Sequence, residues 1–291
     1  MSSLNGLLNI NKPSGRTSRD AINVIQKLVR PTKVGHTGTL DPLANGVLVV
    51  TLGKATRLTE YVQQMAKTYR ATFHFGLKSD TEDIEGNVET VGGPTIERSA
   101  VEAVLPSFTG VIQQRPPAFS ALKVNGKRAY DLARAGEDVQ LAERPIKIHR
   151  IEIVNFDFPR LVLEIECGSG TYIRSLGRDI AESLGTNAVM ESLTRTAVGR
   201  FEISDAIDVE SVSRENIHDS LIDMVSALDG LERLRLTEIE RERISNGQII
   251  QQNDLYMDEA VHEVAALAPN GKLAAILVKR KGGFGPKRNF M

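Results

Sequence analysis

The sequence predicts a mixed α+β fold in which a mostly antiparallel sheet carries flanking helices, with a small β-barrel-like domain at the C-terminal end. Short apolar or alternating runs typical of strands recur along the chain, and amphipathic stretches with capping residues lie between them. The 291 residues fit one large domain plus a small one. We expect the boundary near Asp229 and Gly230, which divides the chain into residues 1–229 and 230–291.

The first part of the chain predicts three strands and two helices. Thr17 or Ser18 caps a helix that runs to about Arg30, and Pro31 ends it. The other expected elements are strands at 6–10, 47–52 and 69–75, a turn at 11–15, a helix at 55–65 and an acidic turn at 79–86.

The middle of the chain predicts further helices that alternate with strands. Two prolines exclude a helix within 113–120, and Gly136 and Gly185 end helices. Strands 146–156 and 161–167 are expected to form a hairpin. The remaining elements are helices at 98–105, 128–135 and 171–184 and a strand at 189–200.

The C-terminal end predicts a helix from Thr237, which caps it, to Ile244, and a small group of strands. The strands are expected at 248–251, 260–267 and 273–279, with a hairpin turn at 269–271. The closing segment 279–288 mixes cations, glycines and one aromatic, so a frayed terminus and an RNA contact are both open for it.

Composition excludes several classes of protein. The net charge of −1 excludes a polycation, although clusters of basic residues fit either nucleic-acid binding or a solvated surface. Cys167 is the only cysteine, which rules out an intramolecular disulfide and fits a reducing cytosol. We find no signal peptide and no apolar run near eighteen residues, so we expect a cytoplasmic protein without a membrane anchor.

The polar loop 35–46 is the first candidate site. It holds a single carboxylate, Asp41, together with His36 and three glycines, and the apolar run 47–50 anchors it to the core. Pro42 disfavours a helical backbone at Asp41. Residue patterns alone leave open a catalytic carboxylate and an aspartate that shapes a turn.

Two other segments could support chemistry at that carboxylate. Tyr69 and Arg70 open a strand and could stack a base and pair a phosphate, although a tyrosine in such a strand is more often simply half-buried. Arg174 follows a glycine turn into a helix and could reach a carboxylate. Metal-ligand spacing, a nucleotide-binding loop and a serine-nucleophile elbow are all absent from the sequence, so we expect no metal and no cofactor.

Six blocks of sequence together resemble the bacterial tRNA pseudouridine synthase B (TruB) family. Their order and spacing match from residue 6 to about 205, and the string Gly-His-Thr-Gly-x-Leu-Asp-Pro is the most specific. The blocks are 11–15, 35–48, 67–71, 79–86, 116–123 and 167–176. The resemblance implies a pseudouridine synthase fold followed by a small RNA-binding PUA domain.

The resemblance also implies roles for individual residues. Asp41 is expected to be the nucleophilic carboxylate and Arg174 the cation that pairs with it. Tyr69 is expected to stack on the target uracil and to assist proton removal from C5. His36 is expected to wedge into the T-loop, and Lys12 to support the catalytic loop or contact RNA. The other expected RNA contacts are Thr37, Gly38, Tyr172 and Leu193, the last against the flipped base.

The function implied is isomerisation of the T-loop uridine at tRNA position 55, by base flipping and without guide RNA, metal or cofactor. The expected partner is the T-arm of tRNA, and the expected state is a monomer without an obligate protein partner. One alternative is a guide-RNA-dependent, dyskerin-type synthase, which usually carries extra terminal segments, whereas this chain begins close to the first block. A non-catalytic chaperone that folds tRNA is another. Whether the carboxylate attacks C1′ or assists C2′ deprotonation through a glycal stays open.

Overall fold

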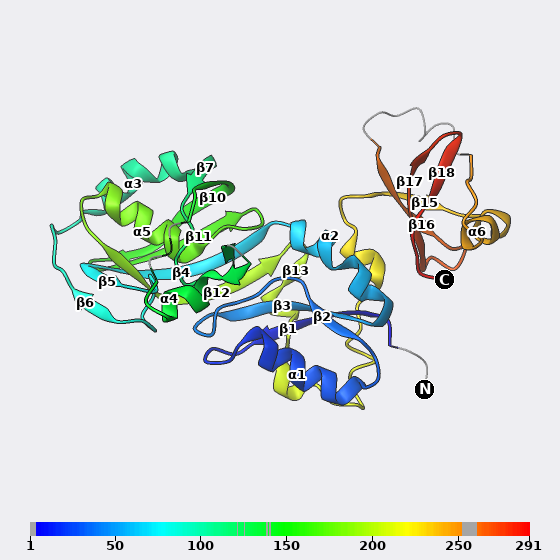
Figure 1. The fold of residues 1–291 in the computed structure, drawn as a ribbon, viewed down its shortest axis with the longest axis horizontal. Coiled ribbons are helices and arrows are strands. Elements are labelled where there is room, and N and C mark those ends of the chain that lie inside the picture. The colour runs from blue at the N-terminus through cyan, green and yellow to red at the C-terminus, as the bar shows by residue number, and fades with distance from the viewer. Residues whose placement is uncertain (1–3, 121, 125, 138, 140, 252–260) are drawn as a thin grey trace.

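The structure is a computed structural model that describes residues 4–120, 122–124, 126–137, 139, 141–251 and 261–291 (Figure 1). A ten-stranded sheet forms its larger part, in the order β14-β1-β3-β12-β4-β11-β10-β7, with β13 beside β12 and β2 beside β3. Its strands are β1 (Gly6–Lys12), β2 (Val34–His36), β3 (Asn45–Leu52), β4 (Lys67–Phe75), β7 (Gly110–Gln114), β10 (Arg144–Asp157), β11 (Arg160–Cys167), β12 (Ala188–Val198), β13 (Phe201–Glu202) and β14 (Ile207–Asp208).

Most neighbouring strands of this sheet run antiparallel. The exceptions are β1 with β14 and β12 with β3, which pair parallel. The mixed, mostly antiparallel α+β sheet that the sequence predicts is therefore confirmed. Two short hairpins lie outside it, β5 (Leu77–Ser79) with β6 (Val88–Thr90) and β8 (Lys123–Val124) with β9 (Lys127–Arg128).

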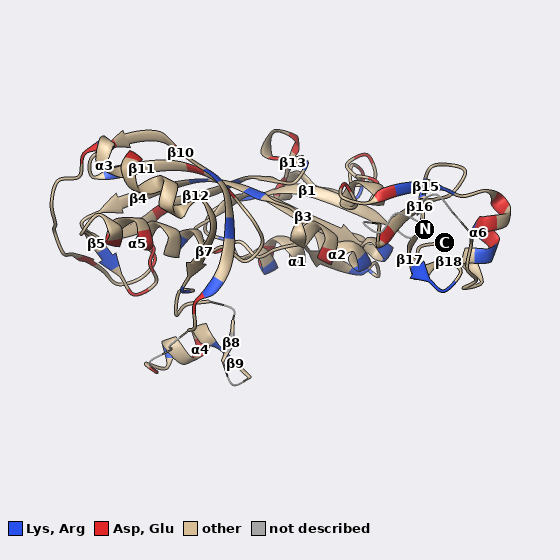
Figure 2. Cartoon of the chain, turned by 90° about the horizontal axis from the view of Figure 1, so that it is seen from above, with Lys and Arg blue, Asp and Glu red and all other residues tan. Residues whose placement is uncertain are grey.

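Helices cover the sheet and frame its loops. They are α1 (Ser18–Val29), α2 (Thr59–Gln64), α3 (Arg98–Val104), α4 (Ala129–Arg134) and α5 (Ile173–Ser183), with 3-10 turns η1 (Gly53–Leu58), η2 (Leu105–Phe108), η3 (Ile203–Asp205), η4 (Val209–Ser211) and η5 (Met224–Ala227). Figure 2 shows α4 and the β8–β9 hairpin projecting from the body of the molecule. Among the described residues, no helix has the length and apolarity needed to cross a membrane.

Local chemistry explains how α1 and α5 sit on the sheet. The side chain of Thr17 accepts from the backbone N–H of Asp20 while the Asp20 carboxylate accepts from the Thr17 N–H, a capping box that starts α1. Helix α5 packs very closely on β4 at Gly177. A Cβ atom added there would lie only 2.1 Å from the ring of Phe73, so no larger residue fits without a shift of that ring. Glycine at this position lets α5 approach the centre of the sheet.

The C-terminal sheet has the order β15-β16-β17-β18. Its strands are β15 (Glu232–Arg235), β16 (Glu263–Leu267), β17 (Leu273–Arg280) and β18 (Gly283–Asn289), with α6 (Glu238–Ser245) beside them. Thr237 caps α6, as the sequence predicts. The barrel-like closure predicted for this part stays a prediction.

The structure corrects several expected elements. The predicted helix 55–65 is split into η1 and α2, because the hydroxyls of Thr56 and Thr59 donate to backbone carbonyls three residues earlier. The predicted strand 248–251 is reduced to one bridge between Ile250 and Phe284. The start of the predicted strand at Ala260 lies outside the described residues, and the strand seen begins at Glu263.

The basic segment 279–288 is not a frayed end. It holds the last residues of β17 and most of β18, which pair with each other. Among the strands that the sequence prediction missed are β2, β7 and β15. All three are short, and β2 and β7 end on polar residues, so neither alternation nor an apolar run marks them.

Candidate active site at the Asp41 loop

Three contacts fasten the loop between β2 and β3 to the body of the molecule. The N–H of Leu40 donates to the hydroxyl of Ser18 at 2.8 Å, and that hydroxyl donates to the Leu40 carbonyl at 3.1 Å. The N–H of Thr37 donates to the Val49 carbonyl at 3.1 Å. Asp41 follows directly with a side chain that is 37% exposed, so a rigid backbone presents its carboxylate to solvent.

Lys12 supports this loop from inside. Its side chain is fully buried, and Nζ donates to the carbonyls of Pro13, Arg16 and Pro42 at 2.8, 2.5 and 3.4 Å. Burial lowers the pKa of Lys12 to about 8, although the negative charge of Asp41 acts to raise it. These contacts fit the loop support expected for Lys12, and its role toward RNA stays a prediction.

Arg174, in the first turn of α5, contacts Asp41 directly. Its Nε donates to Asp41 Oδ2 at 3.0 Å and lies 3.5 Å from Asp83 Oδ2. Its two terminal nitrogens donate to the carbonyls of Thr81 and Phe119 at 2.7 and 3.1 Å. The buried guanidinium thus joins the carboxylate loop to the loops 79–86 and 115–120, in the geometry that charge-assisted bonding favours.

Tyr69 lies on β4 beside the same cleft and is 9% exposed. Burial raises the pKa of its phenol above the ordinary value of 10.0, although the guanidinium of Arg195 opposes this. The phenol is therefore neutral near pH 7, where it offers a ring face and an O–H donor rather than a phenolate.

Arg195, on β12, is a site residue that sequence reasoning missed. It is almost fully buried, and its Nε and Nη2 donate to the carbonyls of Val47 and Gly38 at 2.7 and 3.2 Å. It therefore ties the candidate catalytic loop to the centre of the sheet. Its partners are backbone carbonyls about 150 residues away, which no local pattern marks.

The cleft around these groups has a volume of about 980 Å³. Its lining includes Thr37, Gly38, Asp41, Tyr69, Tyr172 and Arg174, with Tyr130 and Arg134 from the projecting α4. The guanidinium of Arg144 lies over the ring of Tyr172 at 4.9 Å. Such a cleft, with a carboxylate, aromatic rings and cations, suits a flipped nucleoside within a phosphate backbone.

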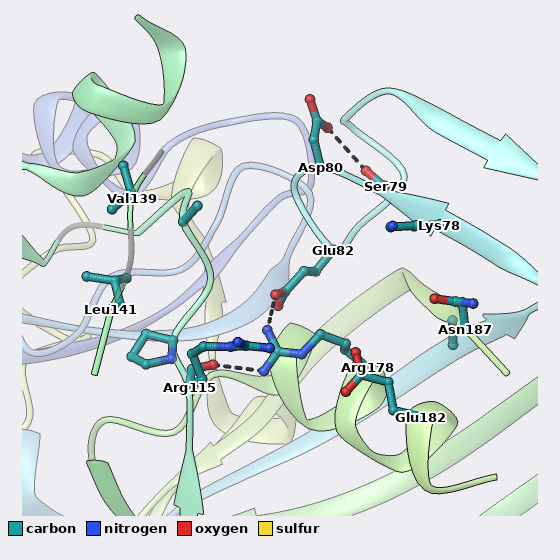
Figure 3. A pocket seen from close by; sticks show the side chains of 13 residues that line it. Lys78, Ser79, Asp80, Glu82, Arg115, Val139, Leu141, Arg178, Glu182 and Asn187 are labelled. Carbon is teal, nitrogen blue, oxygen red and sulfur yellow. Dashed lines mark hydrogen bonds and ion pairs between the residues drawn. The ribbon is translucent and has the colours of Figure 1, made fainter. Parts of the chain in front are cut away.

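A second cavity of about 560 Å³ lies beyond the acidic loop 79–86. Figure 3 shows Glu82 and Arg178 in direct contact in its lining, with Arg115 alongside. Within the described part of the chain, no three histidine, cysteine, aspartate or glutamate side chains are grouped as a metal site would require.

The family model for the N-terminal domain of TruB family pseudouridylate synthases matches residues 26–173, about half of the chain. The chain belongs to the TruB family. Relatives are similar in sequence to this chain along most of its length. The tRNA pseudouridine synthase B of Clostridium acetobutylicum is 43% identical over 84% of this chain and 84% of its own, and that of Bradyrhizobium diazoefficiens is 41% identical over 85% and 74%. The protein of the same name from Clostridium tetani is 38% identical over 97% and 98%.

Solved structures share the fold at lower identity. A Cbf5–Nop10–Gar1 complex contains a chain with a TM-score of 0.72 and 24% identity, covering 98% of this TruB-family chain and 84% of that one. An H/ACA RNP bound to a substrate RNA gives a TM-score of 0.73 at 22% identity, over 98% and 85% of the two chains. These likenesses concern the fold alone.

Three of the residues expected at the site of a TruB-family protein are not in the lining of the cleft: Lys12, buried beneath the loop as described above, His36 and Leu193. His36 ends β2, and its Nδ1 is buried with no hydrogen-bond partner within the described ranges. Burial lowers the pKa of His36, so the ring is neutral near pH 7. Leu193 is 7% exposed and pairs with Ala71 in the sheet core. Their roles toward RNA stay predictions.

Proposed function

We propose that this protein is a tRNA pseudouridine synthase that isomerises the T-loop uridine at tRNA position 55, without guide RNA. The contact between Asp41 and Arg174, beside the ring of Tyr69 in a nucleoside-sized cleft, carries the proposal. Membership of the TruB family, and relatives named tRNA pseudouridine synthase B, support the same activity.

Asp41 is the group that we assign to the sugar. Pseudouridylation breaks the C1′–N1 bond, turns the uracil and forms a C1′–C5 bond, while the C5 proton is lost and N1 gains one. No redox change occurs. An accessible carboxylate beside the ribose can attack C1′ or accept the C2′ proton, and the fixed guanidinium of Arg174 supplies its counter-charge once RNA excludes water from the cleft.

Tyr69 is the residue that we assign to the base. A uridine inside a folded loop must leave its stack to reach Asp41, and an aromatic ring at the cleft compensates part of the lost stacking. Because its phenol is neutral near pH 7, we expect stacking to outweigh proton transfer by this side chain.

The rest of the molecule suits a T-arm substrate. Arg134 and Arg144 line the cleft and are placed to meet RNA phosphates. We assign residues 1–229 to catalysis and residues 230–291 to a PUA-like RNA-binding domain. The protein is proposed to act as a monomer in the cytoplasm, without metal or cofactor.

A guide-RNA-dependent synthase is the competing function. The fold shared with Cbf5 complexes fits it, but identities of 22–24% to those chains are far below the 41–43% to proteins named tRNA pseudouridine synthase B. The two functions differ in whether tRNA alone is a substrate.

The test is pseudouridine formation in an unmodified tRNA transcript without guide RNA. We expect wild-type protein to modify the T-loop uridine, and Asp41→Ala to bind the transcript but form no product. Lack of product from wild type would overturn the proposal, and product only after addition of a guide RNA would favour the competing function. RNA binding without any modification would favour the chaperone.

A further inference from the structure

Glu82 of the acidic loop faces the second cavity and not the Asp41 cleft. It accepts a hydrogen bond from the hydroxyl of Ser175 at 2.7 Å and forms an ion pair with Arg178 Nη1 (Figure 3). The side chains of Glu82 and Arg178 are only 13% and 16% exposed. Arg178 Nη2 also donates to the Arg115 carbonyl at 2.9 Å. The pair is therefore a largely buried contact between α5 and two loops.

The backbone of Glu82 has a φ of 64°, a left-handed conformation that residues other than glycine seldom adopt. Its carbonyl accepts from the Met190 N–H at 3.0 Å, and the Ile84 N–H donates to the Met190 carbonyl at 3.2 Å. The loop is thus held to β12 while the Glu82 side chain turns toward α5. A strained residue of this kind persists where several contacts determine it together.

Two arginines one helical turn apart on α5 contact the same two loops. Arg174 reaches the carbonyls of Thr81 and Phe119, and Arg178 reaches Glu82 and the Arg115 carbonyl. Arg174 points into the cleft and bonds to Asp41, whereas Arg178 lines only the second cavity. Arg178 thus contacts, from the side of the second cavity, the same two loops whose carbonyls bind Arg174 in the cleft.

We propose that Glu82 and Arg178 are positioning residues for the reaction of the TruB-family site. Their ion pair, called the latch below, fixes the loops 79–86 and 115–120 against α5 and so keeps Arg174 directed at Asp41. The inference rests on the proposed function, because it assigns Arg174 and Asp41 to the reaction.

The latch is tested with Glu82→Gln, which keeps the size of the side chain, and Arg178→Met, which keeps its stem. The control is Arg160→Met, the same substitution at the more exposed 2.8 Å ion pair between Arg160 on β11 and Glu191 on β12. Because small misplacement of reacting groups is costly, we expect the single-turnover rate on tRNA to fall about tenfold or more. The Kd for tRNA should stay near that of wild type, as should the rate of the control.

Two further measurements separate positioning from general destabilisation. In an Arg174→Lys background, Arg178→Met should lower the rate far less than in wild type, since the latch acts through Arg174. The crystal structure of Arg178→Met should show Arg174 Nε moved from its 3.0 Å contact with Asp41. The latch would be overturned if the contact between Arg174 and Asp41 stayed in place in Arg178→Met. It would also be overturned if the folded variants kept the wild-type rate, or if Arg178→Met lowered the rate equally in the wild-type and Arg174→Lys backgrounds. An inactive wild-type protein would instead overturn the proposed function, and the crystal structure would still decide the latch.

Discussion

At the scale of single residues, Tyr69 separates stacking from proton transfer. Tyr69→Phe keeps the ring and should retain most activity, whereas Tyr69→Leu removes it. Because stacking of a base on an aromatic ring is worth about 1–3 kcal/mol, we expect kcat/KM of Tyr69→Leu to fall about five- to 150-fold. The measurement is pseudouridine yield over time on a tRNA transcript. Equal losses in both variants would assign the essential role to the hydroxyl.

Cys167 gives a prediction that depends on pH. Its side chain is 1% exposed, and burial raises the pKa of the thiol from 9.0 to about 11. At pH 8 only about one thiol in a thousand is then a thiolate, so reaction of the native protein with a disulfide reagent should be very slow. In urea the same thiol should react promptly.

The pH dependence of this thiol has a definite sign. The folded-state pKa lies above the unfolded one, so the unfolded chain loses its proton first between pH 9 and 11, and stability falls as pH rises through that window. Native and unfolded thiols that react at similar rates at pH 8 would contradict the burial of Cys167.

Residue patterns marked Asp41 and Arg174 as separate candidates, and only the family resemblance predicted that they pair. Local patterns left Asp41 open between a catalytic and a turn-shaping role. The residues that organise the site around it, Arg195 and Asp83, make long-range contacts that spacing along the chain cannot encode. Their carbonyl and guanidinium partners become visible only once the sheet has brought β3, β12 and α5 together.

At the scale of elements, β7 shows how a missed strand orders the site. Gln114 at its end is fully buried, and its side-chain amide bonds to both backbone groups of Tyr172. Nε2 donates to the Tyr172 carbonyl at 3.0 Å, and the Tyr172 N–H donates to Oε1 at 2.9 Å. A polar residue at a buried strand end breaks the alternation that predicts a strand, but here it holds the start of α5.

We therefore expect Gln114→Glu to impair the site. The new carboxylate can still accept the hydrogen bond from the Tyr172 N–H. Its other oxygen, however, cannot donate to the Tyr172 carbonyl as the amide nitrogen does. A buried polar group left without a hydrogen bond costs about 1–3 kcal/mol. The free energy of unfolding, measured with urea, should fall by that amount, and kcat should fall with it. The neighbouring, exposed Gln113→Glu is the control and should change neither. Unchanged kcat in a folded Gln114→Glu would show that β7 does not position Tyr172.

At the scale of the whole molecule, the two sheets share one apolar cluster. Leu7, Leu58 and Val62 of the larger part pack in it with Ile276 and Phe290 of the C-terminal part. Figure 1 shows the C-terminal sheet placed next to α2. The segment 279–288 was expected either to fray or to contact RNA. It does not fray, because it pairs in the sheet between Ile276 and Phe290, which lie in a core that spans both parts. The RNA contact stays a prediction.

The cations of β18 take part in the same junction. Arg288 Nη2 lies 2.8 Å from Glu60, and Lys287 pairs with Glu263, whose carboxylate accepts from the hydroxyl of Tyr61 at 2.7 Å. Sequence composition could mark this segment as basic. It could not show that the charges face α2, because their partners lie more than 200 residues earlier or on β16, two strands away in the same sheet.

The shared core predicts that the two parts unfold together. Phe290 is 5% exposed, and the Arg57 guanidinium lies 5.2 Å from its ring centroid, so Phe290→Ala leaves a cavity at the junction. We expect it to lower the free energy of unfolding by about 3–5 kcal/mol, whereas Phe158→Ala, at a ring 39% exposed, should cost far less. Urea unfolding followed by circular dichroism measures both. Wild type should show one transition, because neither part can lose its share of the cluster alone. Two separate transitions in wild type, or equal costs of the two substitutions, would mean that the C-terminal part is held only by its surface ion pairs.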